Sequence, residues 1–334
     1  MSATMRDVAR VAGVSVKTVS NVVNDFPYVS EATRRRVRAA IDQLGYQMNF
    51  SARNLSLGRT GMVTLAVPEL SLPYFAELSD EIIDAAAARG YTVLIEQTGG
   101  LRQREMEVLF SARRRMTDGL IFSPLALRGG DASALEVDFP IVLLGERALH
   151  SQVPHVAMAN VDGARAVTEH LLAQGRRRIA VVGGFDESGT GAGSLRTAGV
   201  RAALAEAGLA LDDALVGHAA TWTRGTGADA MRSLLERGRP FDAVVGLNDV
   251  LALGAMRVLY ERGVGVPDDV AVVGFDDIEE ARFSRPSLTT VDPGRTQIAR
   301  TAVELLLERL DGGTSRAVEV VADHRLVPRE STGA

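Results

Sequence analysis

Near the start of the chain, a short polar stripe carries side chains suited to hydrogen bonding with bases. Lys17, Ser20 and Asn21 are spaced three and four residues apart, so they share one face of a helix. Val19 and Val22 occupy the opposite face, which can be buried. Reading base edges in a DNA major groove requires a helix of this kind, with one buried face and one hydrogen-bonding face.

The sequence predicts another short helix just before this stripe. A tight turn joins it to the helix that carries the stripe. The residues of its apolar side are Val8, Ala9, Val11 and Ala12. Gly13 tolerates the left-handed conformation that ends such a helix. Ser15 can then cap the next helix by accepting a hydrogen bond from the amide of Lys17 or Thr18. The stretch therefore indicates a helix-turn-helix motif.

The charge of the chain is distributed unevenly. Residues 1–60 contain nine Lys or Arg against four Asp or Glu, whereas the whole chain has 37 against 42 and a net charge of −5. A basic head on an acidic body indicates that one end of the molecule meets a polyanion. This excess lies on the same segment as the helix-turn-helix motif, which favours DNA as that polyanion.

The sequence lacks the residue patterns of the common catalytic and metal sites. Residues 183–193, GGFDESGTGAG, are glycine-rich and follow an apolar run, but they lack the lysine of a phosphate-binding loop. The five histidines are scattered, no G-x-S-x-G segment occurs, and there is no cysteine. We therefore expect a binding protein rather than an enzyme, with no catalytic residues, metal or cofactor.

These candidate residues must be positioned by a small helical head and a larger body. A third helix at 31–44, capped by Ser30, completes the head, and residues 45–61 are typical of a linker. Beyond it, helical periodicity alternates with apolar runs such as 62–68, 118–124, 177–184 and 270–277. This alternation predicts an α/β fold with parallel sheets covered on both faces. The strands are too many for one compact sheet, so we expect two doubly wound lobes with a cleft between them.

Length and composition limit the number of domains and the class of protein. A chain of 334 residues suits two or three domains, and its 46% hydrophobic residues can fill their cores. No run of about 18 apolar residues is present, so we expect no membrane span. The chain enters the helical motif without an apolar signal segment, which favours a cytoplasmic location.

Over essentially its whole length, the chain resembles the lactose-repressor/galactose-repressor (LacI/GalR) family of bacterial transcription regulators. The headpiece of that family is similar to RDVARVAGVSVKTVSNVVN, and its hinge is similar to ARNLSLGRTG. Its effector-binding core is similar to VPELSLPYFAEL, EHLLAQGRRRIAVVGG, GLNDVLALGA and VPDDVAVVGFDD. The resemblance implies periplasmic-binding-protein-like lobes and a homodimer on pseudopalindromic, double-stranded operator DNA.

The family's organisation implies three parts. A helix-turn-helix headpiece would span residues 1–46 and a hinge helix or linker residues 47–60, followed by a two-lobed effector-binding and dimerisation core at 61–334. The first lobe would hold about 61–159 and 291–322, and the second about 160–290 and 323–334.

The resemblance also implies which residues contact DNA. Val16 can meet a thymine methyl group and Lys17 can donate to guanine. Asn21 falls where the family often has arginine, which leaves the base preference there open. Leu55 falls on the hinge leucine that wedges into the minor groove. The full implied set is Ser15, Val16, Lys17, Thr18, Ser20, Asn21, Ala52, Arg53 and Leu55.

Between the lobes, the resemblance implies an effector site. Its residues would be Phe75, Arg196, Trp222, Asn248 and Asp276. Arginine and aspartate offer complementary hydrogen bonds to vicinal hydroxyls or to a base, and an aromatic ring packs on a ligand's apolar face. We thus expect a transcriptional regulator, a repressor, controlled by a sugar or sugar derivative. A nucleoside- or nucleobase-responsive regulator, and a cytoplasmic sugar-binding protein or enzyme, are the alternatives.

Overall fold

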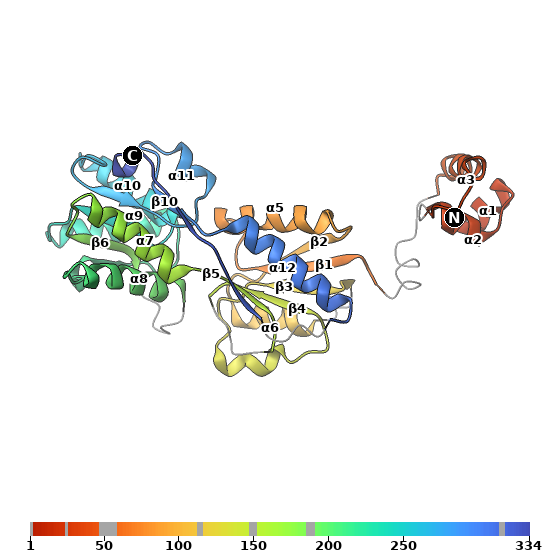
Figure 1. Ribbon diagram of the computed structural model, residues 1–334, viewed down its shortest axis with the longest axis horizontal. Coiled ribbons are helices and arrows are strands. Elements are labelled where there is room, and N and C mark those ends of the chain that lie inside the picture. The colour runs from red at the N-terminus through yellow and green to blue at the C-terminus, as the bar shows by residue number, and fades with distance from the viewer. Residues whose placement is uncertain are drawn as a thin grey trace. The chain divides into compact units, whose positions relative to one another are not determined.

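The computed structural model describes residues 3–23, 26–46, 59–111, 116–146, 152–184, 191–313 and 318–334. Its contacts divide the chain into two compact units, Met1–Thr60 and Gly61–Ala334. Figure 1 shows the first as a cluster of helices and the second as two α/β lobes.

Three helices form the first unit: α1 (Met5–Ala12), α2 (Val16–Val23) and α3 (Glu31–Leu44). Their ends follow the predicted caps. Gly13 ends α1 with φ 63°, in the left-handed region. Ser15 accepts the amide of Thr18 at 3.0 Å before α2, and Ser30 accepts the amide of Thr33 at 3.3 Å before α3. Each cap satisfies an amide that the helix itself leaves free.

A small apolar core holds the three helices together. Its buried residues are Val8, Ala9, Ala12, Val19, Val22, Val37 and Ala40. Val11, expected on the buried side of α1, is instead 45% exposed. At 3.6 residues per turn Val11 lies nearly opposite Ala9, so the face that buries Val8, Ala9 and Ala12 leaves its side chain exposed.

The first lobe is built on a six-stranded parallel sheet in the order β11-β5-β4-β3-β1-β2. Its strands are β1 (Met62–Val67), β2 (Thr92–Gln97), β3 (Gly119–Phe122), β4 (Ile141–Leu144), β5 (His155–Met158) and β11 (Glu319–Ala322). Along β3, the buried Ile121 joins one core cluster while Leu120 and Phe122 join another. The sheet therefore buries apolar side chains on both faces, as predicted.

Helices cover both faces of this sheet. The covering elements are α5 (Pro73–Ala87), α6 (Arg102–Phe110), the 3-10 helix Gly129–Leu135 and α12 (Arg295–Leu310). Figure 1 shows α5 and α12 together on one side, and α6 on the other. The edge strand β2 is mostly exposed, with Leu94 and Ile95 each 37% accessible.

A four-stranded parallel sheet in the order β7-β6-β8-β9 forms the second lobe. Its strands are β6 (Ile179–Gly184), β7 (Val216–His218), β8 (Ala243–Gly246) and β9 (Ala271–Val273). The helices are α7 (Asn160–Ala173), α8 (Ala192–Glu206), α9 (Arg224–Glu236), α10 (Asp249–Glu261) and the short α11 (Glu279–Phe283). Helix α7 packs on α8 and α9 packs on α10, which confirms the predicted doubly wound class.

Short antiparallel strands join the two lobes. They are β10 (Thr290–Asp292) and β12 (Arg325–Val327), which pair with each other. These two strands, β5 and β11 were not predicted, because each contains a charged or polar residue and none lies in a continuous apolar run. Two further 3-10 turns complete the described chain, at Asp213–Leu215 and Glu330–Thr332.

Candidate functional site

Helix α2 has the two-sided character that the sequence predicted. Val19 and Val22 are buried, whereas Val16 is 42% exposed and Lys17 is exposed beside it. Asn21 is half-buried on the same helix. The hydrophobic contacts that hold α2 to the other helices thus leave its first turn open to a partner.

Ser15 and Thr18 make contacts within the start of α2. The two hydroxyl oxygens are 2.8 Å apart, and Ser15 also accepts the Thr18 amide. Their first role is therefore to shape the N-terminal turn, which carries Val16 and Lys17. The implied hinge contacts Ala52, Arg53 and Leu55 lie outside the described residues.

Two aromatic residues between α2 and α3 were not predicted from the sequence as site residues. Tyr28 is 88% exposed and Phe26 is 47% exposed, and their rings meet edge to face with centroids 5.7 Å apart. An exposed tyrosine hydroxyl beside a recognition helix can donate to a backbone phosphate. The available signal was two aromatic residues flanking Pro27 in an otherwise polar loop.

In the core unit, the side chain of Arg196 is the centre of a buried polar cluster. It lies on α8, is 2% exposed, and its Nε donates to the Asn160 amide oxygen at 2.7 Å. Its Nη1 donates to the Leu247 carbonyl at 2.5 Å and lies 3.4 Å from Oδ1 of Asp276. Residues from α7, α8 and the ends of β8 and β9 therefore converge on one guanidinium.

Aromatic rings enclose the same guanidinium. Its central carbon lies 3.7 Å from the ring centroid of Phe275 and 5.5 Å from that of Trp222. Trp222 is half-buried, so part of its ring is available to a ligand. Cation–π attraction and stacking hold the guanidinium plane in place. Phe275 was not foreseen, because an aromatic residue in an apolar strand reads as ordinary core.

Burial and neighbouring charges act against each other at Asp276. The residue is 5% exposed, and its desolvation raises the pKa of the carboxyl from 3.8 to about 6. The nearby Arg196 and Arg295 favour the charged form and limit the rise. At neutral pH the carboxylate is therefore mostly ionised and faces Arg196 as a compensating charge.

Asn248 and its neighbour Asp249 organise the loops around this cluster. The side-chain oxygen of Asn248 caps α10 by accepting the Leu251 amide at 3.0 Å, so its amide nitrogen is the group left to offer a ligand. The fully buried Asp249 accepts the Ile278 amide at 3.0 Å, and its desolvation raises the pKa of its carboxyl well above the usual value. Asp249, which the sequence reasoning missed, thereby ties α10 to the loop after Asp276.

On the first-lobe side, Phe75 is half-buried on α5. Its ring meets that of Tyr74 edge to face, with centroids 5.3 Å apart. Tyr74 is buried, and burial together with the charge of Asp276 raises the pKa of its phenol. Tyr74, which the sequence did not predict, is therefore within electrostatic reach of the polar cluster.

Two buried polar atoms of the cluster lack a hydrogen-bond partner among the described residues. They are Asn160 Nδ2 and Asp276 Oδ1, although the latter faces Arg196 at the 3.4 Å given above. Leaving buried polar atoms unbonded costs about 1–3 kcal/mol each, a cost that a bound molecule or water placed between them would remove. Among the described residues, no group of three or more histidine or acidic side chains is placed to hold a metal.

Comparison with known proteins identifies the chain. The model of bacterial regulatory proteins of the lacI family matches residues 4–49, and that of the periplasmic binding protein-like domain matches residues 168–332. The transcriptional regulator CelR of Thermobifida fusca is 35% identical over 339 residues, covering 98% of each chain. The chain belongs to the LacI family.

Solved LacI-family structures share its fold. The Lac repressor dimer bound to operator and the anti-inducer ONPF is 28% identical, covers 100% of both chains and has a TM-score of 0.87. The complex of the transcriptional regulator CelR with cellobiose is 34% identical, covers 98% of this chain and 99% of that one, and has a TM-score of 0.73. This LacI-family protein is a DNA-binding transcriptional regulator, with its helix-turn-helix in the first unit and two periplasmic-binding-protein-like lobes in the second.

Two expectations remain, one compared with the relatives and one with the structure. The LacI-family proteins it matches are transcription regulators rather than enzymes. Within the described residues, no helix of this family member has the length and apolar character needed to cross a bilayer.

Proposed function

We propose that the polar cluster around Arg196 binds a neutral, polyhydroxylated effector, a sugar or sugar derivative, and that this ligand controls operator binding. The observation that carries the proposal is the pairing of Arg196 with Asp276 at 3.4 Å beside buried polar atoms without partners. A guanidinium and a carboxylate in opposition offer donors and acceptors to vicinal hydroxyls, which need both.

The charge balance of the cluster favours a neutral ligand over an anion. Asp276 compensates Arg196, so a ligand that brought its own charge would leave one charge unpaired in a buried site. Trp222 offers a partly exposed ring for the apolar face of a pyranose. The cellobiose complex of the related CelR supports a carbohydrate. A nucleobase is the second candidate, favoured by the same ring through stacking.

For DNA recognition, we assign the reading of operator bases to the first turn of α2. Val16 and Lys17 are exposed there, with Ser15, Thr18, Ser20 and Asn21 alongside. Ala52, Arg53 and Leu55 would act in the hinge, between a headpiece at 1–46 and a core that begins near residue 61. The protein would act in the cytoplasm as a homodimeric repressor without enzymatic activity.

Removing the guanidinium tests the effector site. Titration calorimetry against neutral mono- and disaccharides, including cellobiose, and against nucleobases should find a carbohydrate that binds the wild-type protein. Arg196→Ala should weaken that binding about tenfold to a hundredfold, because a charge-assisted hydrogen bond contributes about 1.5–3 kcal/mol.

Arg201→Ala is the matched control. Arg201 lies on the same helix, is about half-exposed, and pairs at the surface with Asp213. We expect this variant to bind the sugar as the wild-type protein does. Equal sugar affinity in both variants would place the effector site elsewhere, and tight binding of a nucleobase alone would replace the carbohydrate by the second candidate.

A further inference from the structure

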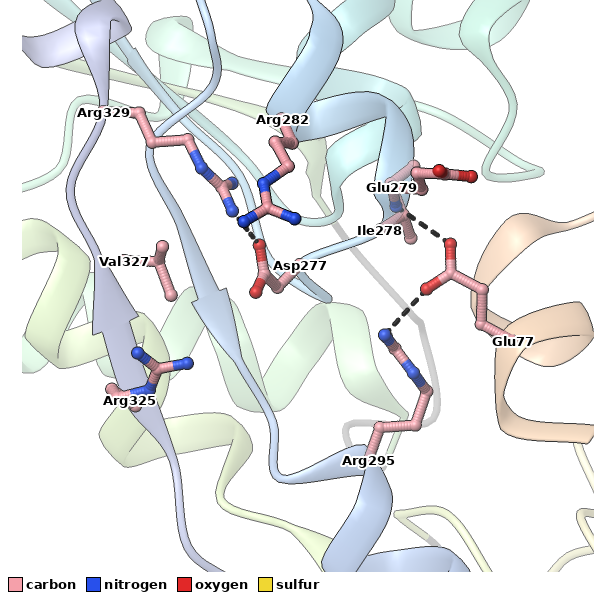
Figure 2. Close-up of a pocket in the computed structure, with 9 residues that line it drawn as sticks. All are labelled: Glu77, Asp277, Ile278, Glu279, Arg282, Arg295, Arg325, Val327 and Arg329. Atoms are coloured by element: carbon pink, nitrogen blue, oxygen red, sulfur yellow. Dashed lines mark hydrogen bonds and ion pairs between the residues drawn. The ribbon is translucent and has the colours of Figure 1, made fainter. Parts of the chain in front are cut away.

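A polar cavity lies against the crossing strand β12, outside the cluster around Arg196. Its volume is about 380 Å³, and Figure 2 shows side chains from several parts of the core directed towards it. None of the five residues predicted to bind the effector lines it. The arginines that line it are Arg282, Arg295, Arg325 and Arg329.

Three of these four arginines are neutralised by a carboxylate. The pairs are Arg295 with Glu77 at 2.7 Å, Arg329 with Asp277 at 2.5 Å and Arg325 with Asp292 at 3.1 Å. Two of the pairs, those of Arg295 and Arg329, are largely withdrawn from solvent. These two ion pairs are therefore part of the packed lining of the cavity and differ from solvent-exposed surface pairs.

Arg282 is the exception. It forms no hydrogen bond or ion pair with the described residues, although it lines the same cavity as Asp277 and Arg329 (Figure 2). The remaining acid, Glu279, points away from these arginines. In addition, Nε of Arg295 is buried without a hydrogen-bond partner in the described part of the chain. The cavity thus has one unneutralised positive charge and spare N–H donors.

Neighbouring guanidinium groups with spare donors are suited to phosphate. Each guanidinium can present two parallel N–H groups to phosphate oxygens, and the doubly charged group tolerates two arginines at once. A cavity of about 380 Å³ falls within the range of small-molecule sites. This charge balance contrasts with that of the Arg196 cluster, where Asp276 already compensates the arginine.

The cavity is assembled from both lobes and from the strand that crosses between them. Glu77 on α5 and Arg295 on α12 belong to the first lobe, whereas Asp277 and Arg282 follow β9 in the second. Glu77 bridges the lobes by accepting the Glu279 amide at 2.9 Å. A ligand here contacts both lobes, so its affinity depends on the angle between them.

One residue also connects the cavity with the effector cluster. While Nη2 of Arg295 pairs with Glu77, its Nη1 donates to the Asp276 carbonyl at 3.0 Å. Asp276 in turn faces Arg196. A change in the position of Arg295 therefore reaches the backbone of a predicted effector residue through a single hydrogen bond.

We propose that this cavity is a second regulatory site that binds a small phosphate monoester through Arg282 and Arg329. Occupation neutralises Arg282, draws the second-lobe loop towards Arg295 and β12, and favours one lobe arrangement. The binding itself does not depend on the identity of the sugar in the cleft. Its effect on DNA rests on the operator-binding role of the family.

Binding is tested on the full chain with inorganic phosphate and glycerol phosphate at constant ionic strength. Titration calorimetry should show saturable binding by the wild-type protein and about tenfold to a hundredfold weaker binding by Arg282→Gln. Arg282 makes no hydrogen bond or ion pair with the described residues, so this variant should keep its thermal unfolding midpoint. Arg300→Gln, which removes the same charge from an exposed position on α12, should bind as the wild-type protein does.

Equal affinity in Arg282→Gln and Arg300→Gln, or binding that never saturates, would overturn the proposal. A second measurement follows DNA binding by fluorescence anisotropy, with a DNA fragment selected by the wild-type protein. Glycerol phosphate should change the DNA affinity of wild-type protein and Arg300→Gln more than that of Arg282→Gln; an equal response would reject the regulatory role. Arg196→Ala should still bind phosphate. Failure of the proposed sugar site can therefore be distinguished from failure of the proposed phosphate site.

Discussion

Asp276 places a carboxylate in a nearly dry site, 3.4 Å from the guanidinium of Arg196. The residue has φ 115°, a conformation that L side chains rarely adopt, and its amide is held by the Val291 carbonyl at 2.9 Å. The backbone strain is tolerated because the surrounding hydrogen bonds fix the loop. Strain of this kind is typical of a residue held for binding rather than for folding.

The raised pKa of Asp276 predicts how effector binding depends on pH. Its folded-state pKa of about 6 lies above the ordinary 3.8, so the folded protein retains this proton as pH rises from 4 towards 6. A sugar hydroxyl that donates to the carboxylate requires the ionised form. We therefore expect the association constant to fall about tenfold between pH 7 and pH 5, as the ionised fraction falls.

Calorimetry at the two pH values checks this expectation, together with proton release on binding near pH 6. Asp276→Asn removes the titrating group and should bind weakly with no such pH dependence. An unchanged affinity of the wild-type protein at pH 5 would show that the effector does not bind the carboxylate.

At the scale of the elements, the crossing of α7 and α8 sets the position of Arg196. Gly199 lies one turn after Arg196, and a Cβ added there would come within 2.2 Å of the Val161 carbonyl oxygen on α7. This close approach brings Arg196 to Asn160, the first residue of α7. The glycine thus serves helix packing and, through it, the geometry of the cleft.

The sign of the change in the free energy of unfolding of Gly199→Ala distinguishes the effect of helix packing from that of helix propensity. Propensity alone would stabilise the helix by about 1 kcal/mol, whereas the clash should lower the free energy of unfolding by about 1–3 kcal/mol. Denaturant titration measures the difference. As a control, Gly225→Ala on α9 meets no atom closer than 3.7 Å and should be neutral or stabilising. A stabilised Gly199→Ala variant would show that the two helices separate without cost.

At the scale of the whole molecule, both edge strands of the first-lobe sheet, β2 and β11, expose apolar side chains. Leu94 and Ile95 of β2 are successive residues that point to opposite faces, and both are 37% exposed. An exposed apolar edge strand invites association. The second lobe also carries exposed rings, those of Tyr260 and Phe283, at 76% and 73%. We predict that the β2 edge and these rings lie in the homodimer interface.

We expect Ile95→Asp to shift the protein from dimer towards monomer, because a buried, unpaired carboxylate at the interface costs several kcal/mol. Sedimentation velocity over a concentration series measures the shift. Val321→Asp on β11, the opposite edge strand of the same sheet, is a matched control and should leave the dimer intact. A dimer weakened only by the control would move the interface to the other edge.

Much of the local structure was determined by the sequence itself. Gly13, Ser15 and Ser30 act on amides and carbonyls within one helical turn, so their effects are visible without knowledge of the rest of the chain. The alternation of apolar strands and amphipathic helices likewise encodes the doubly wound class, because each element must bury its own apolar face. For these reasons the helix predicted at about 31–44 agrees with α3.

The binding geometry was decided only by the tertiary structure. Arg196, a residue that the family resemblance had marked, meets Phe275 and Asp276 because parallel strands end at one edge of their sheet, a relation that spacing along the chain does not express. The cavity around Arg282 depends even more on the tertiary structure, because Glu77 and Arg329 come to it from distant parts of the chain. An unneutralised arginine in the sequence is indistinguishable from a solvated one until the fold shows which carboxylates lie beside it.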